Sequence, residues 1–594
     1  MHLFVQTLEA RYTLLWQCRS LPRYSSNTLH RANHLSPVLS WPHFLVLTLV
    51  FSRGSRNSRP MTSTMDDVEL SIIGDGYSPS KTPSSNQKYR DDDAYLQSLG
   101  KRPLLTRAFG FMSILGLSCS ALLSWEGILV TSISGLLNGG PAGVVWGFLI
   151  NWIGTISVYT SLGELASMAP TSGGQYHWVA MMAPPSWGSF LAYVTGWLTT
   201  LAWQALAVSV SYIVATLIQG ITVLSRPTYV PLPWHTLLII WAVTIFAVLL
   251  NSTTSRALAK CESIILILHL AGFFGVLIPL VYFAPHGSPS EVFTTFFNDG
   301  GWPSQGLSFL VGFPAIAGSL LGADCAVHMS EEIQSAAIIV PRALLYTILV
   351  NGVLAFAMII ALMFCLGDVT AAVESTETLI YPFLEIFHQA VKSTTGAGLL
   401  AGIVLVLAVA SSIGVYASAS RMLWSFSRDL GLPFSKYLVR LNKTSLPVVS
   451  IVTTLVVTIL LSLIVLGSAI ALNALLSLAI AALFSSYTLV ISLLLWRRVS
   501  GAIRPYITRS DDAASGQLTW GPWRLPEPFG SINNIFSIVY SVFLLFWSFW
   551  PQQTPTTPEG FNWSVVVFAG VVMFSVLWYV VRAKFYFKGL LCSK

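Results

Sequence analysis

Long apolar segments constrain this chain more than any other feature. The hydrocarbon core of a bilayer is about 30 Å thick, so a spanning helix needs about 20 consecutive apolar residues. Segments of that kind lie at residues 109–136, 140–163, 188–220, 233–251, 263–283, 303–329, 343–366, 394–420, 446–467, 470–496, 531–550 and 562–581. Only the first and the sixth contain an acidic or basic residue, Glu126 and Asp324 respectively. The pattern predicts an all-α polytopic membrane protein with about twelve transmembrane helices.

The charge content excludes a water-soluble protein of ordinary composition. Only 10% of the 594 residues are charged, whereas a soluble domain carries about 25%. The net charge of +7 does not indicate nucleic acid binding, because the basic residues fall between apolar segments instead of forming a patch on a soluble face. We therefore expect the lipid bilayer as a partner, and neither nucleic acid nor a cofactor.

The distribution of Lys and Arg predicts the orientation, because cytoplasmic loops are enriched in these residues. Basic residues follow the fourth, eighth and tenth segments: Arg256, Lys260, Arg421, Arg428, Lys436, Arg440, Lys443, Arg497, Arg498, Arg504, Arg509 and Arg524. The loops on the other side carry only Arg226 and Lys392 beside the acids Glu291, Asp299, Asp368, Glu374, Glu377, Glu385 and Glu559. This bias places both termini in the cytoplasm.

The apolar segments also divide the chain into regions. Residues 1–108 lack a core-forming pattern and are expected to be a disordered cytoplasmic tail. Residues 1–60 are either part of that tail or a reading frame extended upstream of a start at Met61 or Met65. The expected regions after the tail are a transport core of helices one to ten (109–496), a cytoplasmic loop (497–530), helices eleven and twelve (531–581) and a C-terminal tail (582–594).

Two segments combine an acid with small and hydroxylated residues. Glu126 ends the stretch from Ser118, and Asp324 ends the stretch from Ala317. A charge at membrane depth costs about 3 kcal/mol or more, so it usually marks a transport pathway or a buried pair. The first and sixth segments cross in opposite directions, which is the layout of a five-plus-five inverted repeat with a binding site at two broken helices. The alternative is that each acid caps a helix or pairs with a neighbour.

Three motifs occur in the loops that we assign to the cytoplasm. The first runs from Gly163 to Trp178, where Pro170 stops one helix and Gly173-Gly174 permit a tight return. The second runs from Asp324 to Glu332 and is followed by Pro341-Arg342-Ala343. The third runs from Ser420 to Asp429 and is followed by Gly431-Leu432-Pro433. Over roughly residues 95–585 the chain resembles the amino acid–polyamine–organocation superfamily, and within it the fungal amino acid/choline transporter group that includes GABA and choline permeases.

This resemblance implies a proton- or gradient-driven carrier, a symporter that works by alternating access. Its substrate would be a small amine or amino acid of the GABA, choline or polyamine class, held mainly by main-chain groups between the two breaks. The residues that the resemblance assigns to substrate binding are Ser118, Cys119, Ser120, Ser124, Trp125, Glu126, Gly127, Gly318, Ser319, Gly322 and Asp324. We expect the plasma membrane as the location, with a vacuolar or other internal membrane as the alternative.

The first break departs from the pattern of the superfamily. Many of its amino acid carriers have a Gly-Ser-Gly-Ile-Phe-like run where this chain has Trp125-Glu126-Gly127-Ile128-Leu129. An ionised Glu126 would repel a carboxylate and attract an ammonium group, and Trp125 could add a cation–π contact of about 1–2 kcal/mol. Alternatively, Glu126 holds a proton and carries it as the coupling ion, together with Asp324. The sequence does not decide between these two roles.

Several charged residues flank the ends of the spans. Glu164, Glu331 and Glu332 follow the second and sixth segments, and Arg421 and Arg428 follow the eighth. They could form an inward gate of ion pairs, or they are ordinary helix-end and loop charges. His328 has no cluster of Cys or His around it, so we predict no metal site. We expect a packed or gate-lining histidine there, with a role in proton transfer as the alternative.

Other classes of function fit less well. An enzyme would need a nucleophile with a base, or a metal cluster, inside the spans, and none is visible. No phosphate-binding loop of the form Gly-x4-Gly-Lys-Ser/Thr occurs, which argues against direct use of ATP. The main alternative is a nutrient sensor that has a transporter fold and no net flux.

Overall fold

The computed structural model describes residues 87–367, 380–467, 469–506, 518–558, 560–587 and 589. The expectations for residues 1–86, and for residues 588 and 590–594 of the C-terminal tail, lie outside this part of the chain. So do the predicted loop charges Asp368, Glu374, Glu377, Arg509 and Glu559.

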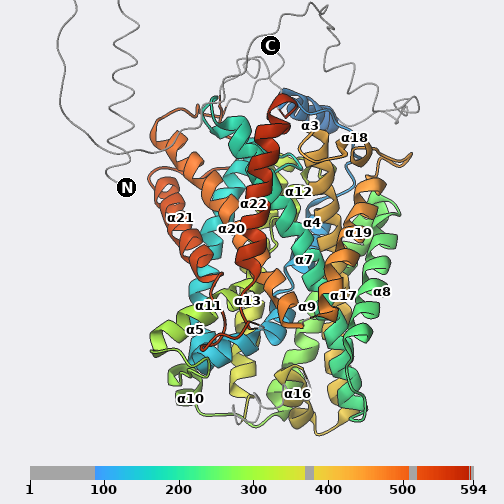
Figure 1. The fold of residues 1–594 in the computed structure, drawn as a ribbon, viewed down its shortest axis with the longest axis vertical. Coiled ribbons are helices and arrows are strands. Elements are labelled where there is room, and N and C mark those ends of the chain that lie inside the picture. Colours follow the sequence, from blue (N-terminus) through green and yellow to red (C-terminus); the bar gives the residue numbers. More distant parts are fainter. Residues whose placement is uncertain are drawn as a thin grey trace, which may run out of the picture. The chain divides into compact units, whose positions relative to one another are not determined.

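The described residues form a bundle of helices, with two isolated β-bridges and no β-strand (Figure 1). The helices of the first half are α3 (Gln87–Ser98), α4 (Phe111–Leu122), α5 (Ser124–Met168), α6 (Gln175–Met182), α7 (Gly188–Ser225), α8 (Pro233–Asn251), α9 (Ser255–Phe283) and α10 (Pro289–Thr294). Those of the middle are α11 (Gln305–Ala317), η1 (Gly318–Leu320), α12 (Cys325–His328), η2 (Ser330–Glu332), α13 (Ala336–Phe364) and α16 (Pro382–Val391). The last are α17 (Thr394–Arg428), α18 (Ser435–Leu438), α19 (Val448–Ser462), η3 (Leu463–Leu466), α20 (Ala469–Val499), α21 (Phe529–Trp547), α22 (Ser564–Val581) and η5 (Ala583–Phe585).

Ten helices of the described residues are long and apolar enough to cross a membrane. One of them, Phe111–Met168, contains both the first and the second predicted segment, and Gly140 interrupts it with a φ of 65°. Within the sixth predicted segment, the apolar helix covers only Gln305–Leu320 and is shorter than a full span. The all-helical membrane fold is therefore confirmed, whereas the count of twelve and the inverted repeat stay predictions.

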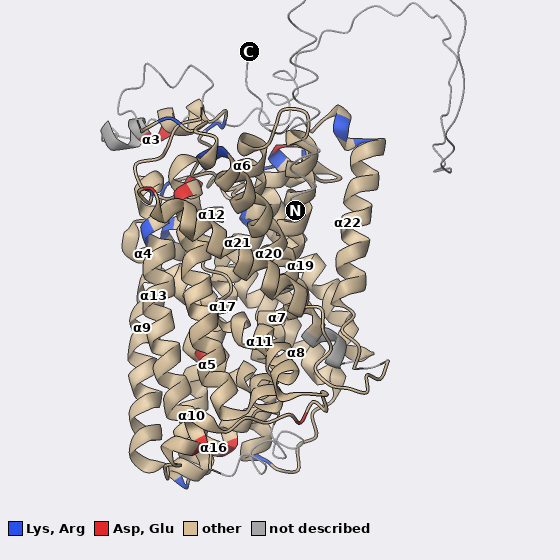
Figure 2. Ribbon diagram, turned by 90° about the vertical axis from the view of Figure 1, so that its left-hand side faces the viewer, with Lys and Arg blue, Asp and Glu red and all other residues tan. Residues whose placement is uncertain are grey.

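The outer helices expose apolar side chains, as a lipid-facing surface requires. Leu249 of α8, Ile267 of α9 and Leu577 of α22 each expose more than 60% of their surface. The charged residues gather at the two ends of the bundle, one of which carries α3, α6 and α12 and the other α10 and α16 (Figure 2). We call these the α3 end and the α10 end. The arrangement supports an integral, multi-pass membrane protein.

Residues 87–108 differ from the disordered tail that we predicted. They form α3 and a following segment that lies against the bundle, where the Tyr95 hydroxyl donates to the Met168 carbonyl over 2.8 Å. Lys101 forms an ion pair with Asp429 at the end of α17, and both side chains are largely buried. Leu96 and Leu105 are buried as well, so both polar and apolar contacts hold this segment against the bundle.

Helices α4 and α9 approach each other so closely at Gly116 that their backbones touch. A Cβ atom on Gly116 would lie 2.2 Å from the carbonyl oxygen of Glu262. We predict that Gly116→Ala lowers the free energy of unfolding in mixed detergent micelles by about 1–3 kcal/mol, because the helices must move apart. Gly402→Ala on α17 is the control, since a Cβ there has no atom within 4 Å. Equal stability of the two variants would contradict this close packing.

Candidate functional site

The first span is interrupted at one residue. Helix α4 ends at Leu122, Leu123 has left-handed backbone angles (φ 49°, ψ 56°), and α5 begins at Ser124. The interruption leaves few unpaired backbone groups, because Leu123 donates to the Ser120 carbonyl and Gly127 donates to the Leu123 carbonyl. The chain changes direction here without exposing many polar groups to an apolar environment.

The second interruption is longer and lies after α11. The 3-10 turn η1 is followed by extended Leu321 and by Gly322, whose φ of 115° favours glycine. The amides of Gly322 and Ala323 both donate to the Tyr159 hydroxyl, over 3.2 and 3.3 Å. Tyr159 belongs to α5, so the second span satisfies the backbone that is freed in the sixth.

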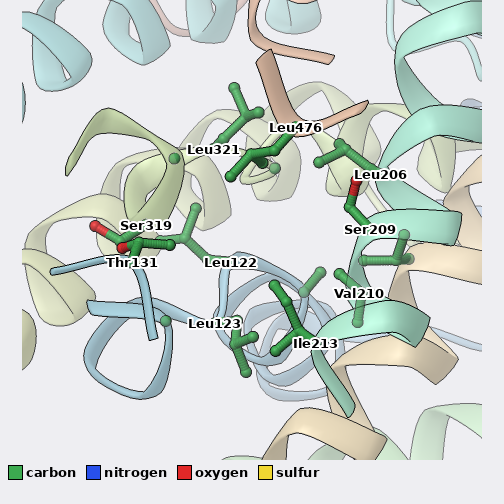
Figure 3. A pocket seen from close by; sticks show the side chains of 15 residues that line it. Leu122, Leu123, Thr131, Leu206, Ser209, Val210, Ile213, Ser319, Leu321 and Leu476 are labelled. Carbon is green, nitrogen blue, oxygen red and sulfur yellow. The ribbon is translucent and has the colours of Figure 1, made fainter. Parts of the chain in front are cut away.

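The two interruptions face each other. A Cβ on Gly322 would lie 3.5 Å from the carbonyl oxygen of Ala121, and one on Gly127 would lie 3.8 Å from Cβ of Ser319. Between them lies a cavity of about 40 Å³. Its lining residues are Ala121, Leu122, Leu123, Gly127, Thr131, Leu206, Ser209, Val210, Ile213, Gly318, Ser319, Leu321, Gly322, Val415 and Leu476. None of these described residues is charged, and the side chains that converge on the cavity are mostly aliphatic (Figure 3).

Four of the predicted substrate-binding residues line this cavity, and the others lie outside its lining. Those in the lining are Gly127, Gly318, Ser319 and Gly322. Those outside it are Ser118, Cys119, Ser120, Ser124, Trp125, Glu126 and Asp324, all of them buried. Ser124 donates to the side chain of Asn351 over 2.5 Å, and Ser118 lies 3.5 Å from the Cys325 sulfur. Several of the polar residues near the first break therefore bind neighbouring helices.

Glu126 contacts a histidine that our sequence analysis did not single out. Its Oε1 lies 2.7 Å from Nδ1 of His269 on α9, and both side chains are almost completely buried. The Trp125 ring packs against the rings of His269 and Phe273, with centroids about 6 Å apart. The second oxygen of Glu126 and Nε2 of His269 have no hydrogen-bond partner among the described residues. Glu126 is thus paired with α9 and is not a residue of the cavity lining.

Asp324 belongs to a polar cluster between the second break and α6. It accepts a hydrogen bond of 2.8 Å from the Gln175 side chain, and its Oδ2 lies 3.8 Å from Nε2 of His328. The Nδ1 of His328 donates to the Ser172 carbonyl over 3.0 Å, and its ring packs on Trp203. No group of three or more His, Cys, Asp or Glu that could hold a metal is found in the described part of the chain.

Four of the five candidate gate residues form two ion pairs at the α3 end. Arg428 makes two hydrogen bonds to Glu331, of 2.7 and 2.8 Å, and Arg421 contacts Glu332 over 2.9 Å. The backbone amide of Ser172 also donates to Glu331. These contacts join α17 to η2 and to the loop before α6.

The third predicted acid has a different partner. Glu164 contacts Arg498 of α20 over 2.5 Å and accepts from the Leu525 amide, whereas Arg421 and Arg428 pair elsewhere. Arg498 also binds Glu527 and lies over the Trp520 ring. The pair therefore joins the second span to α20 and to the chain before α21. Neither Arg498 nor its role was anticipated, because the sequence places it among many loop arginines.

The pKa values of two acids at the α3 end are lowered. Burial alone would raise the pKa of Glu331 and of Asp429, but Arg428 lowers the first and Lys101 lowers the second below their ordinary values of 4.5 and 3.8. A lowered pKa in the folded state means that the acid is more easily ionised there than in the unfolded chain. The stabilisation from both acids is therefore complete at neutral pH, and it declines only as the pH falls below those ordinary values.

We predict a large stability cost when the Glu331–Arg428 pair is broken. Arg428→Gln leaves Glu331 buried without its cation, which costs about 3–5 kcal/mol. The control is Arg107→Gln, because its partner Asp93 is half-exposed, so water can solvate the Asp93 carboxylate after the cation is lost and the cost should be smaller. Unfolding free energies in mixed micelles measure both. The double variant Glu331→Gln/Arg428→Gln should lose less than the sum of the single variants; full additivity would contradict a direct coupling.

Comparison with known proteins assigns the chain to a family. Residues 109–572 match the family model described as "Amino acid permease". The choline transporter of Saccharomyces cerevisiae is 30% identical over 82% of this chain and 83% of its own length. An uncharacterized amino-acid permease of Schizosaccharomyces pombe is 29% identical (85% and 89% covered), and amino-acid permease 2 of Neurospora crassa is 26% identical (86% and 92% covered). The chain belongs to the amino acid permease family, whose members are membrane transporters and not enzymes.

Proposed function

We propose that this protein is a secondary active transporter of amino acids or related amines, of the GABA, choline or polyamine class. Transport would be coupled to protons and proceed by alternating access. The observation that carries this proposal is the cavity between the two helix interruptions. The names of the relatives, a choline transporter and amino-acid permeases, support the same class of substrate.

The size of the cavity supports a cycle of opening and closing. Its volume of about 40 Å³ is well below the roughly 150 Å³ of a cavity that binds benzene. An amine with seven or more heavy atoms does not fit, so the helices around the cavity must separate before the substrate enters. The conformation seen here would be a closed state of the cycle. In other states the same site would open first to one side of the membrane and then to the other.

The lining supports recognition by main-chain groups and hydroxyls. Thr131, Ser209 and Ser319 are the lining residues that carry a hydroxyl, and no described lining residue is charged. Because Glu126 contacts His269 instead, the geometry favours a positioning or proton-binding role for Glu126 over direct pairing with a cationic substrate. An ammonium group would then bind carbonyl oxygens that the interruptions free, as such breaks commonly provide.

The ion pairs at the α3 end support an inward gate. Glu331–Arg428 and Glu332–Arg421 join α17 to the segment after the second break, so they must separate if these elements move apart. We propose that this end faces the cytoplasm, with both termini on that side, and that the protein resides in the plasma membrane. The cluster of Asp324 and His328 would lie between this gate and the cavity.

Uptake by intact cells tests the proposed function. We would express the full chain in cells that lack their own amine and amino acid permeases. Uptake of labelled choline, GABA, a polyamine and a set of amino acids would then be measured with and without a protonophore. We expect uptake of at least one of these compounds and a loss of most of it with the protonophore. A protein that reaches the membrane and moves none of them would favour a sensor without flux.

The variant Glu126→Gln separates the two roles of that acid, with Glu385→Gln on α16 as the control at an outer position. We predict that Glu126→Gln changes the Michaelis constant for a cationic substrate less than threefold. A tenfold or greater increase for cations, with unchanged uptake of neutral amino acids, would instead make Glu126 the counter-charge of the substrate.

A further inference from the structure

Glu262 is a buried acid that the site described above does not use. Our prediction began the fifth span at residue 263, but α9 begins at Ser255 and carries Glu262 into the apolar bundle. Its exposed surface is 0%, and it forms no ion pair with any described residue. Its Oε1 has no hydrogen-bond partner among these residues, and its Oε2 lies 3.1 Å from the Ser120 hydroxyl.

The hydrogen bonds available to the Ser120 hydroxyl indicate whether Glu262 is a carboxylate or a carboxylic acid. The Ser120 hydroxyl has one hydrogen and two neighbouring acceptors, the Leu117 carbonyl at 3.1 Å and Oε2 of Glu262 at 3.1 Å. If Glu262 is ionised, only one of these contacts is a hydrogen bond. If Glu262 is a carboxylic acid, it donates to Ser120 and Ser120 donates to Leu117, so both contacts are satisfied. A buried carboxylate without a cation would also cost several kcal/mol.

The charged and titratable groups around Glu262 do not replace the missing cation. On α9 and the helices beside it, some acids and bases are paired: Glu126 with His269, Arg421 with Glu332, and Arg428 with Glu331. Others are exposed: Arg256, Lys260, Arg342, Tyr282 and Tyr346. The rest belong to the first turn of α8 (His235) or to α16 (Glu385, His388). The remaining groups are the thiols Cys119, Cys261, Cys325 and Cys365 and the hydroxyl of Tyr416, which bonds to Thr244 and Thr458. Glu262 therefore differs from Glu126, which contacts a histidine.

We propose that Glu262 binds the proton that is transported with the substrate. This inference rests on the proposed function and extends it, because it assigns the coupling site to the contact between α4 and α9 and not to Glu126. Glu262 lies about 10 Å along α9 from Ser255 at the α3 end, so the proton is exchanged with water on that side.

The packing at Gly116 links the protonation of Glu262 to the position of α4 against α9. The backbones of α4 and α9 touch at Gly116 and Glu262, and the Glu262 side chain is completely buried. When Glu262 carries a proton, this contact is stable. When the proton leaves, the remaining carboxylate needs water, so α4 must move away from α9. Helix α4 ends at the first break, and its movement opens the wall of the cavity that Ala121 and Leu122 form.

Reconstituted full-length protein tests this assignment. We would compare wild type, Glu262→Gln, Glu126→Gln and the control Glu385→Gln in vesicles loaded for two assays. One assay is the accumulation of labelled choline, or of whichever labelled compound wild type takes up, under an imposed proton gradient. The other is exchange of that compound at equal concentrations without a gradient. We expect Glu262→Gln to lose gradient-driven accumulation at least tenfold and to keep exchange within threefold of wild type.

Other outcomes of the two assays would overturn either the Glu262 assignment or the proposed function. Full accumulation in Glu262→Gln, or loss of both assays in it, overturns the assignment, and so does loss of gradient response in Glu126→Gln alone. If wild type moves nothing, the proposed function fails, and infrared difference spectra of the purified protein still decide the state of Glu262. A protonated carboxyl band at neutral pH that disappears in Glu262→Gln supports the assignment. Identical spectra of the two proteins overturn it.

Discussion

Backbone amides that leave a helix inside a membrane must find new partners, because no water is there to accept their hydrogen bonds. The two interruptions in this bundle meet that requirement in different ways. At Leu123 the chain turns within one residue and keeps most helical hydrogen bonds. At Gly322 it opens further, and the Tyr159 hydroxyl accepts from two freed amides. The cavity lies between two breaks whose freed backbone amides find hydrogen-bond acceptors within the protein.

Buried charged side chains also need partners within the protein, and those of this bundle lie at two different depths. At the α3 end, acids and arginines form close pairs that join α17 to η2 and α20 to α5. Deeper in the bundle the groups are fewer: Glu126 shares its environment with His269, and Glu262 has only a serine hydroxyl. The paired charges are suited to a gate that opens and closes as a unit, while an unpaired acid is suited to gaining and losing a proton.

The sequence predicted the membrane helices well, because a lipid environment requires long apolar runs; the prediction of 233–251 coincides with α8. It also identified both interruptions, since small and hydroxylated residues around one acid are unusual in a span. It could not identify Tyr159 or His269 as parts of the site, nor Glu262 as a buried acid. Each acts on a residue more than 100 positions away in the chain, and a single histidine or tyrosine in an apolar segment has no distinctive local pattern. The ordered segment 87–108 was missed for a related reason, because its ion pair and hydrogen bond to the bundle join residues far apart in the chain and only a few apolar side chains accompany them.

Chemical protection of a cysteine at the cavity tests most directly whether substrate binds between the interruptions. Ser319→Cys places a thiol in the lining, and Ser290→Cys on the exposed α10 places one outside it. The rate of alkylation by a small thiol reagent would be measured with and without a saturating transported compound, in protein that retains uptake. Our account predicts that the compound slows alkylation at position 319 at least fivefold and leaves position 290 unchanged. Equal rates at position 319 with and without the compound would contradict it.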